Sequence, residues 1–314
     1  MSGNSVPRIV GIGELLWDIL PNGPRLGGAL ANFAVFCARL GDRAELITSI
    51  GDDDYGRTAS RVLAQPNLDL HNVQVSTTYP TGTVQVALSS ENQPSYTIST
   101  GVAWDYIQLT PEISASAPLA DAVCFGTLSQ RSEVSRSTIR SFVESTPSNC
   151  VRVCDVNIRM PYIGPEILSW SMLHATMIKI SEEELPLVFS QLGRPLTSNM
   201  PQVAARSLLA NFPQCQLVAV TLGAHGSLIV TRQEVHIHTG FPIKLVDPVG
   251  AGDAFTAGLV HAYLSGAPLA RMPEIGNLCG SFVASQPGAT PLLPRDLIDM
   301  VSTLVDGGVP RFAR

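Results

Sequence analysis

The chain of 314 residues is 45% hydrophobic and only 15% charged, a composition that supports a large buried core and argues against disorder. It carries 20 basic and 26 acidic side chains, and the resulting net charge of −6 argues against a nucleic-acid surface, which needs clustered cations. No apolar run is long enough to span a bilayer, and the N-terminus lacks a basic segment followed by a long apolar one. We therefore expect a cytoplasmic protein with neither a nucleic-acid nor a membrane partner.

Short apolar segments alternate with helical patterns from the N-terminus onward. Strands are predicted at residues 8–14, 44–51, 121–128, 151–157, 176–180 and 216–223. Helices are predicted between them at residues 31–41, 55–65, 132–144 and 165–173. A hairpin over residues 226–239 and three helical segments from Ala251 onward complete the chain. The alternation predicts βαβ units, and therefore a three-layer, doubly wound α/β fold whose mostly parallel sheet is covered on both faces.

One region interrupts this alternation. Residues 73–103 alternate in polarity with a period of two and show no helical pattern. Together with the residues that follow the first strand, they predict a small antiparallel sheet inserted into the α/β layer. We expect a single domain over residues 1–314, with this insertion at about residues 15–27 and 73–105. The insertion is interpreted as a lid over the site; the alternative is a β-flap without a function.

Six cysteines lie in apolar contexts such as AVCFG and VRVCDV, without a repeated pair motif. Cys150 and Cys154 have the spacing of half a metal site, but no second half follows them. Buried free thiols are therefore expected, rather than disulfides or a zinc site.

Two familiar nucleotide motifs are incomplete. GIGELLWD at residues 11–18 follows a strand, but Leu16 stands where a dinucleotide-binding fingerprint needs its third glycine. Lys179 and Lys244 are the two lysines of the sequence, and neither follows a glycine-rich loop as a Walker motif requires. A phosphate site must therefore be built without a P-loop.

The most specific motif is DPVGAGDAFTAGL at residues 247–259. Gly250, Ala251 and Gly252 predict a turn that enters a helix, and such a turn exposes backbone N–H groups to anions. Asp253 follows directly. An acidic residue that merely stabilises the helix dipole would explain the carboxylate, but not the small residues that leave the amides bare.

At this motif the chain resembles the PfkB/ribokinase family of carbohydrate kinases, nearest to its bacterial fructokinase-like members. The resemblance covers nearly the whole length. The matching segments, in chain order, are GELLWD, GGALANFAVFCARLG, GDDDYG, PTGTV, AWD, FGTLSQRS, DVNIR, TLGAHGS, DPVGAGDAFTAG and SQPGATPLLP. The resemblance implies a ribokinase-like fold and ATP-dependent transfer of a phosphoryl group to a hydroxyl of a small neutral sugar, with fructose as the first candidate.

The resemblance also implies roles for individual residues. Asp253 corresponds to the catalytic base, and the amides of Gly250, Ala251 and Gly252 correspond to the anion hole. The implied sugar contacts are Asp18, Gly28, Asn32 and Arg159. The implied nucleotide contacts are Thr221, Gly223, Gly226, Asn277 and Lys179. The implied metal-associated residues are Glu184 for Mg²⁺ and Asp247 for a monovalent cation such as K⁺.

Two departures from the family pattern are visible. Ser181 stands where the family carries the asparagine of its magnesium-associated motif, so a contact to metal or phosphate is expected to be longer or absent, while Glu184 keeps the charge. Pro248 stands where many members carry threonine, and proline removes one N–H donor. The family also implies a homodimer that pairs through the lid.

Other substrates and functions stay open at this stage. Ribose, a keto-deoxy sugar acid, a phosphorylated hexose and a nucleoside are alternative acceptors. Residues 73–105 contain no cation, which favours a neutral sugar, although Arg25, Arg131 and Arg159 can converge from elsewhere. A sensor of the same fold without turnover is a second hypothesis, with Ser181 as the damaging change. A dehydrogenase is a third hypothesis, and it rests on GIGELL alone.

Overall fold

A ten-stranded sheet forms the middle layer of the protein, which we describe from a computed structural model over residues 6–21, 23–88 and 94–309. The strand order is β14-β13-β12-β11-β10-β9-β1-β4-β5, with β6 beside β4. The strands are β1 (Arg8–Ile12), β4 (Arg43–Gly51), β5 (Leu68–Asp69), β6 (Val73–Ser76), β9 (Ala122–Gly126), β10 (Val151–Asp155), β11 (Met177–Ser181), β12 (Leu217–Thr221), β13 (Ser227–Val230) and β14 (Val235–His238). Pairings from β12 to β5 are parallel, whereas β12, β13 and β14 pair antiparallel.

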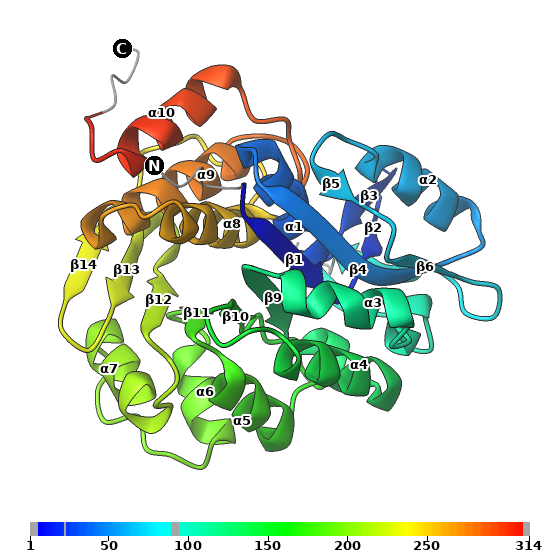
Figure 1. Cartoon of the computed structure of the whole chain (residues 1–314), viewed down its shortest axis with the longest axis horizontal. Coiled ribbons are helices and arrows are strands. Elements are labelled where there is room, and N and C mark those ends of the chain that lie inside the picture. The colour runs from blue at the N-terminus through cyan, green and yellow to red at the C-terminus, as the bar shows by residue number, and fades with distance from the viewer. Residues whose placement is uncertain (1–5, 22, 89–93, 310–314) are drawn as a thin grey trace.

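Helices cover both faces of this sheet (Figure 1). One face carries α1 (Ala29–Leu40), α2 (Asp54–Leu63), α8 (Ala251–Leu264), α9 (Met272–Ala284) and α10 (Arg295–Val305). The other face carries α3 (Pro111–Ser116), α4 (Glu133–Glu144), α5 (Pro165–His174), α6 (Leu185–Gln191) and α7 (Pro201–Asn211). Successive side chains of a strand point to opposite faces, so Ile9 packs in the first layer and Val10 in the second. The predicted three-layer α/β fold is confirmed.

The predicted strands and helices agree with the structure to within a few residues, but three helices were not predicted. Short α3, α6 and α7 lie in segments that contain proline. In each of them a proline occupies the first turn, where no intrahelical N–H bond is required. These prolines mark helix starts. In the sequence alone a proline indicates a turn, so the helices that follow were not predicted.

A second sheet lies apart from the first and contains four strands in the order β3-β2-β7-β8. These strands are β2 (Leu16–Leu20), β3 (Gly23–Gly27), β7 (Gly82–Leu88) and β8 (Pro94–Ile98). The pairs β2/β3 and β7/β8 are antiparallel, and β2/β7 is parallel. We call this sheet the lid.

The lid occupies less of the chain than the predicted range of 73–105. Residues Val73–Ser76 form β6, which pairs with β4 of the central sheet. Residues Ala103–Tyr106 form a 3₁₀ turn. The alternating pattern identified strands correctly, but a period of two does not determine which sheet edge accepts a strand.

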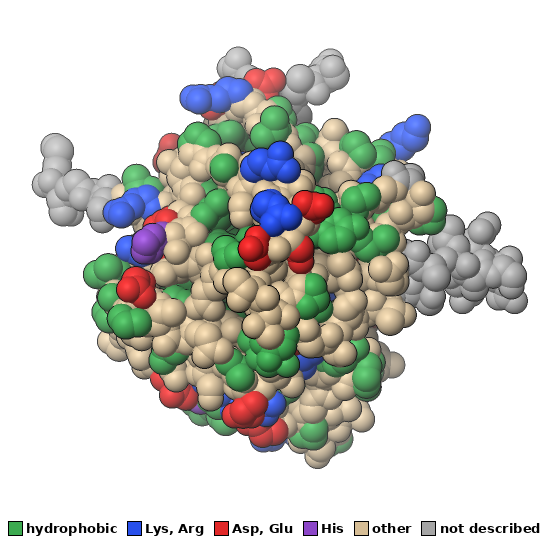
Figure 2. All heavy atoms as spheres, turned by 90° about the vertical axis from the view of Figure 1, so that its right-hand side faces the viewer, with side chains coloured by type: hydrophobic (Ala, Val, Ile, Leu, Met, Phe, Trp, Pro, Cys, Tyr) green, Lys and Arg blue, Asp and Glu red, His purple; other side chains and the backbone are tan. Residues whose placement is uncertain are grey.

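The six cysteines are free and buried, as predicted. In the described part of the chain, no helix is long and apolar enough to cross a membrane. On the face drawn in Figure 2, basic and acidic side chains lie side by side near the upper middle. Among the ion pairs of the structure, Arg57 pairs with Asp52 and Asp54 at the start of α2.

Candidate active site

A cavity of about 810 Å³ lies among the lid, the carboxyl ends of the central strands and the start of α8. The predicted site residues that line this cavity are Asp18, Gly28, Asn32, Arg159, Lys179, Asp247, Gly250, Gly252 and Asp253. The other predicted residues lie outside its lining: Ala251, Thr221, Gly223, Gly226, Asn277 and Glu184. The structure therefore brings the expected sugar and catalytic residues together, and it separates most of the expected nucleotide residues from them.

The first turn of α8 forms one wall of the cavity. Gly250 has φ +81°, and a Cβ at this position would lie 2.2 Å from the carbonyl oxygen of Ala289. The N–H groups of Gly250 and Gly252 have no protein acceptor within the described residues, so they are free to bind an anion. The N–H of Ala251, by contrast, donates to the carbonyl oxygen of Pro248 at 3.2 Å, and Ala251 does not line the cavity, so its part in an anion hole stays a prediction.

Asp253 lies beside these amides. Asn32 Nδ2 donates a hydrogen bond to Asp253 Oδ2 at 2.8 Å, which fixes the carboxylate between α1 and α8. Burial raises the pKa of Asp253 to about 7, and the charge of Asp155 adds to the rise, whereas Asn32 and Lys179 oppose it. A carboxylate with a pKa near neutrality is well matched to accept a proton at physiological pH.

Asp18 reaches the cavity from lid strand β2. Burial raises its pKa to about 6, while Arg159 lowers it and Asp247 raises it further. On the neighbouring strand β3, a Cβ on Gly27 would lie 2.8 Å from Asp18 Oδ2. Gly27 therefore leaves room for the carboxylate. In the sequence it is the first glycine of LGGAL, and nothing there indicates this contact.

Gly28 and Arg159 border the same space. Gly28 precedes α1 with φ +107°, and a Cβ there would lie 2.5 Å from the carbonyl oxygen of Glu14. Glycine is therefore required for this close backbone approach. Arg159 follows β10, is exposed, and donates Nη1 to its neighbour's carbonyl oxygen at 2.9 Å, so its guanidinium keeps further donors for a ligand.

Asp247 is engaged in a way that the sequence did not predict. Arg25 Nη1, from lid strand β3, pairs with Asp247 Oδ2 at 2.6 Å. The N–H of Gly288 also donates to Oδ2, and the N–H of Val249 donates to Oδ1, both at 3.1 Å. Asp247 thus ties the lid to the loop before α8. An arginine thus neutralises the carboxylate for which the sequence predicts a monovalent-cation contact, and that contact stays a prediction.

Glu184 lies behind the cavity wall, between the ends of β10 and β11. Its Oε1 accepts the N–H of Ile158 at 2.6 Å, and its Oε2 accepts the N–H of Ser181 at 2.8 Å. Each carboxylate oxygen retains one lone pair, so a contact to magnesium through water fits, whereas direct ligation from outside the lining does not. No group of three or more potential metal-ligating side chains occurs within the described residues.

The predicted nucleotide residues gather around the end of β14. Thr221 ends β12, and Gly223 and Gly226 form the following turn with φ +56° and +88°. A Cβ on Gly226 would lie 2.0 Å from the carbonyl oxygen of His238. Asn277, buried on α9, donates Nδ2 to the same oxygen at 3.2 Å. These residues shape the backbone beside the cavity.

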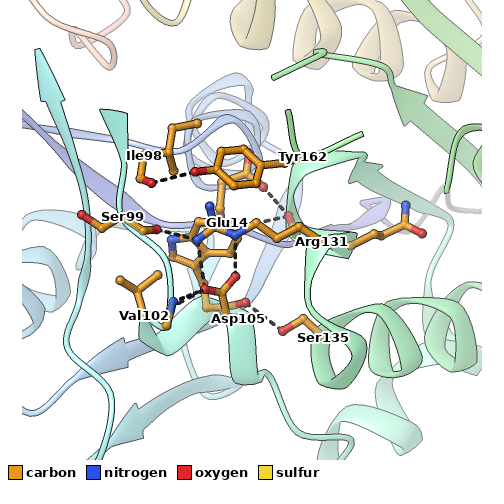
Figure 3. A network of polar contacts seen from close by, with 12 residues as sticks. Glu14, Ile98, Ser99, Val102, Asp105, Arg131, Ser135 and Tyr162 are labelled. Atoms are coloured by element: carbon orange, nitrogen blue, oxygen red, sulfur yellow. Dashed lines mark hydrogen bonds and ion pairs between the residues drawn. The ribbon is translucent and has the colours of Figure 1, made fainter. Parts of the chain in front are cut away.

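An ion pair anchors the lid where β8 returns to the main domain (Figure 3). Arg131 donates to Asp105 Oδ1 at 2.7 Å and to the carbonyl oxygen of Ser99 at 2.6 Å. Its guanidinium lies 3.9 Å from the ring centre of Trp104 and 4.7 Å from that of Tyr162. Arg131 is 6% exposed and does not line the cavity, so it is a structural anchor and does not join Arg25 and Arg159 there.

Sequence reasoning missed two buried carboxylates, one in the cavity lining and one that binds the lysine of that lining. Glu14 follows β1, lines the cavity, and is bound by Ser129 Oγ and by the N–H of Ala29. Asp155 ends β10 and binds Lys179 Nζ at 3.1 Å. Their signal in the sequence was an acidic residue at the carboxyl end of an apolar strand, where ligand sites of doubly wound sheets form.

These features define a class of protein. At one cavity of a doubly wound α/β sheet lie free helix amides that can bind an anion, a lysine, and a carboxylate able to accept a proton. These groups are the ones that a phosphotransferase without a P-loop requires. The chain matches the model of the pfkB family carbohydrate kinases over residues 23–296, and it belongs to that family. It is an ATP-dependent sugar kinase.

Known proteins resemble the chain over nearly its whole length. A fructokinase of Salmonella typhimurium is 32% identical over 308 residues, which cover 91% of this chain and 96% of the relative. A fructokinase from Vibrio cholerae O395, in its fructose, ADP and calcium ion bound form, superimposes with a TM-score of 0.78 at 25% identity, covering 96% of this chain and 100% of that one. An uncharacterized sugar kinase from Pyrococcus horikoshii in complex with ATP gives a TM-score of 0.78 at 27% identity, covering 93% and 99%.

Proposed function

We propose that the acceptor is free fructose and that Asp253 is the base that removes the proton of the attacking hydroxyl. The observation that carries this proposal is the position of Asp253, whose carboxylate has a pKa of about 7 and adjoins the free amides of Gly250 and Gly252 in one cavity. The fructokinase of Salmonella typhimurium, 32% identical, supports fructose as the sugar.

The base and the amides serve different reactants. A sugar hydroxyl is a poor nucleophile, and a carboxylate within hydrogen-bond reach that takes its proton accelerates attack by roughly 10²–10⁴-fold. The amides at the start of α8 face the transferring phosphoryl group, where the helix dipole adds favourable potential. Asn32 holds Asp253 through its hydrogen bond, so the carboxylate keeps its orientation during the reaction.

Lys179 supplies the positive charge that a P-loop would otherwise provide. Its ammonium lines the cavity, 3.1 Å from where a Cβ on Gly252 would lie. Burial lowers the pKa of Lys179, but the carboxylates of Asp155, Glu184 and Asp253 outweigh that effect and raise it, so the ammonium stays charged. It is placed to bind a phosphate oxygen of ATP.

Magnesium, if bound, would supply positive charge that neutralises the phosphates of ATP. This ion usually keeps several waters and takes few protein ligands. Both oxygens of Glu184 already accept backbone N–H groups. Glu184 therefore fits a contact to magnesium that passes through a water molecule. A contact of Asp247 to potassium stays part of the proposal: Arg25 pairs with its Oδ2, while its Oδ1 accepts the N–H of Val249.

Asp18, Asn32 and Arg159, with the backbone at Gly28, are proposed to bind the sugar hydroxyls. A carboxylate accepts hydrogen bonds from two hydroxyls and thereby rejects sugars that lack one of them. In the cavity lining, Arg159 lowers the pKa of Asp18, which carries the opposite charge, and Arg25 forms an ion pair with Asp247. This balance of charge favours a neutral sugar over an anionic one.

The lid is proposed to cover the bound sugar and exclude water, which competes as phosphoryl acceptor. It contributes Asp18 directly and reaches the loop before α8 through the ion pair of Arg25 and Asp247. We also propose a homodimer that pairs through the lid, and a cytoplasmic location.

The test is ADP release with a panel of sugars and magnesium, with and without potassium. Fructose is expected to give the highest kcat/KM among fructose, ribose, a keto-deoxy sugar acid, fructose 6-phosphate and a nucleoside. A higher kcat/KM with any of the others would replace fructose as the substrate. Thermal stabilisation by fructose without ADP release from any sugar would indicate a sensor.

A further inference from the structure

Asp155 connects two elements of the active site through one buried carboxylate. It is the last residue of β10 and is 3% exposed. Its Oδ1 accepts a hydrogen bond from Lys179 Nζ on β11 at 3.1 Å. Its Oδ2 lies 3.1 Å from Thr256 Oγ1 on α8, and the single proton of that hydroxyl is shared with the carbonyl oxygen of Gly252 at 2.9 Å. Thr256 lies one turn after Asp253. The carboxylate therefore fixes the lysine relative to the helix that carries the base.

The position of Lys179 depends on this bond. In the described part of the chain, only one of its three ammonium donors has a protein acceptor, and that acceptor is Asp155. The same ammonium lies next to Gly252, at the cavity wall. A long, unbranched lysine side chain has many rotamers, so a single charged acceptor that selects one of them determines where the remaining donors point.

We propose that Asp155 is a positioning residue for phosphoryl transfer, which holds the Lys179 ammonium over the first turn of α8. Asp155 does not touch the reacting atoms; it acts through Lys179 and through its electric field. The inference rests on the proposed function, because it requires Asp253 to act as the base.

The charges around Asp253 set the sign of the expected effect. Asp155 from β10 and Glu14 from the end of β1 raise the pKa of Asp253, whereas Lys179 from β11 lowers it. The thiol of Cys124, on β9, also faces Asp253, but burial raises its pKa well above the usual value and keeps it neutral. Burial raises the pKa of Asp155 itself, whereas the Lys179 ammonium lowers it. Where Asp155 is ionised, removal of its charge lowers the pKa of Asp253, and removal of the Lys179 charge raises it.

The test compares the pH dependence of kcat/KM for fructose in the wild type, Asp155→Asn and Lys179→Met. We call the fall of kcat/KM at low pH the acid limb. In Asp155→Asn the acid limb is expected to move to lower pH by roughly one unit. The plateau is expected to fall by about 10- to 100-fold, the range for losing the partner of a charged hydrogen bond, because Lys179 is no longer held. In Lys179→Met the acid limb is expected to move to higher pH.

Glu45→Gln is the matched control. Glu45 is also a buried carboxylate, bound by Arg8 and Asn72, but it does not line the cavity. Its variant is expected to lose thermal stability and to keep the wild-type acid limb. A merely structural role of Asp155 would lower activity equally at every pH, and an acid limb that stays in place in Asp155→Asn would overturn the proposal.

Two further outcomes keep the result decisive. Should Asp155→Asn fail to fold, Lys179→Met carries the test, and an unmoved acid limb in that variant overturns the proposal. Wild-type kcat in Asp253→Asn would instead contradict the proposed base. An inactive Asp253→Asn together with an unmoved limb in Asp155→Asn overturns only the role of Asp155.

Discussion

The proposed acceptor side and the proposed nucleotide side of the site are built differently. On the acceptor side, Asp18, Asn32 and Asp253 come from β2, α1 and α8 and present polar side chains to one cavity. On the nucleotide side, Gly226 and Asn277 meet at the carbonyl oxygen of His238 and shape the backbone there, outside the cavity lining. The first region works through side-chain chemistry, and the second through backbone shape.

This difference separates two kinds of mutational effect. Substitutions on the acceptor side should change turnover or sugar affinity, because each side chain is proposed to interact with a reacting or recognised group. Substitutions on the nucleotide side should change the KM for ATP and the thermal stability, since they alter local packing. Four variants, taken from the largest expected effect to the smallest, test this separation.

Asp253→Asn is expected to have the largest effect. An amide of the same shape cannot accept the proton, so kcat should fall by roughly 10²–10⁴-fold, while the Kd for fructose from calorimetry changes little. Asp54→Asn is the matched control, because Asp54 also lies in the first turn of a helix, α2, and its side chain is 99% exposed. Equal losses in the two variants would mean that Asp253 only stabilises its helix.

Gly250→Ala tests the free amides. The new Cβ would lie 2.2 Å from the carbonyl oxygen of Ala289 at φ +81°, so the turn must move and its N–H groups with it. Loss of one preorganised donor costs roughly 10²–10³-fold in kcat. Gly266→Ala has a similar φ of +74° with no atom within 4 Å of the Cβ, and it should lose stability without a change in kcat. A normal kcat in Gly250→Ala would remove the amides from the mechanism.

Asp18→Asn should raise the KM for fructose by about 10- to 100-fold, as expected for the loss of a hydrogen bond to a charged group. The KM for ATP should stay near its wild-type value, because Asp18 belongs to the acceptor side. Steady-state kinetics with each substrate varied in turn distinguishes the two. A larger change in the KM for ATP would contradict the assignment of this carboxylate to the sugar.

Asn277→Ala should have the smallest effect. It removes a neutral hydrogen bond to the carbonyl oxygen of His238, which predicts a rise of roughly 2- to 10-fold in the KM for ATP, with some loss of Tm. Turnover at saturating ATP should be retained. If kcat fell as far as in Asp253→Asn, the separation of the two sides would be wrong.

Much of the fold was predictable because its signals are local. Short apolar runs identified the strands of the central sheet, and helical patterns between them identified the major helices. Residues Val73–Ser76 were assigned to the lid, because a short strand does not carry the identity of its partner. Helix α7 was missed because Pro201 at its start reads as a turn when the sequence is taken alone.

The site was predictable where a role belongs to a motif, and not where it depends on distant partners. Gly250 and Asp253 stand in one segment, and the structure places both at the cavity. The ion pair between Arg25 and Asp247 joins residues more than 200 positions apart, and no local sequence pattern predicts it. The same holds for Asp155, whose two hydrogen-bond partners lie on β11 and α8.

The central claim is that Asp253 acts as a base with a pKa near neutrality, and the pH dependence of wild-type kcat/KM for fructose tests it most directly. Protonation of Asp253 predicts a constant value at alkaline pH and a loss of roughly tenfold per unit below about pH 7. Asp18, with a pKa of about 6, should steepen the fall below that value. A profile that stays level down to about pH 5 would contradict the account.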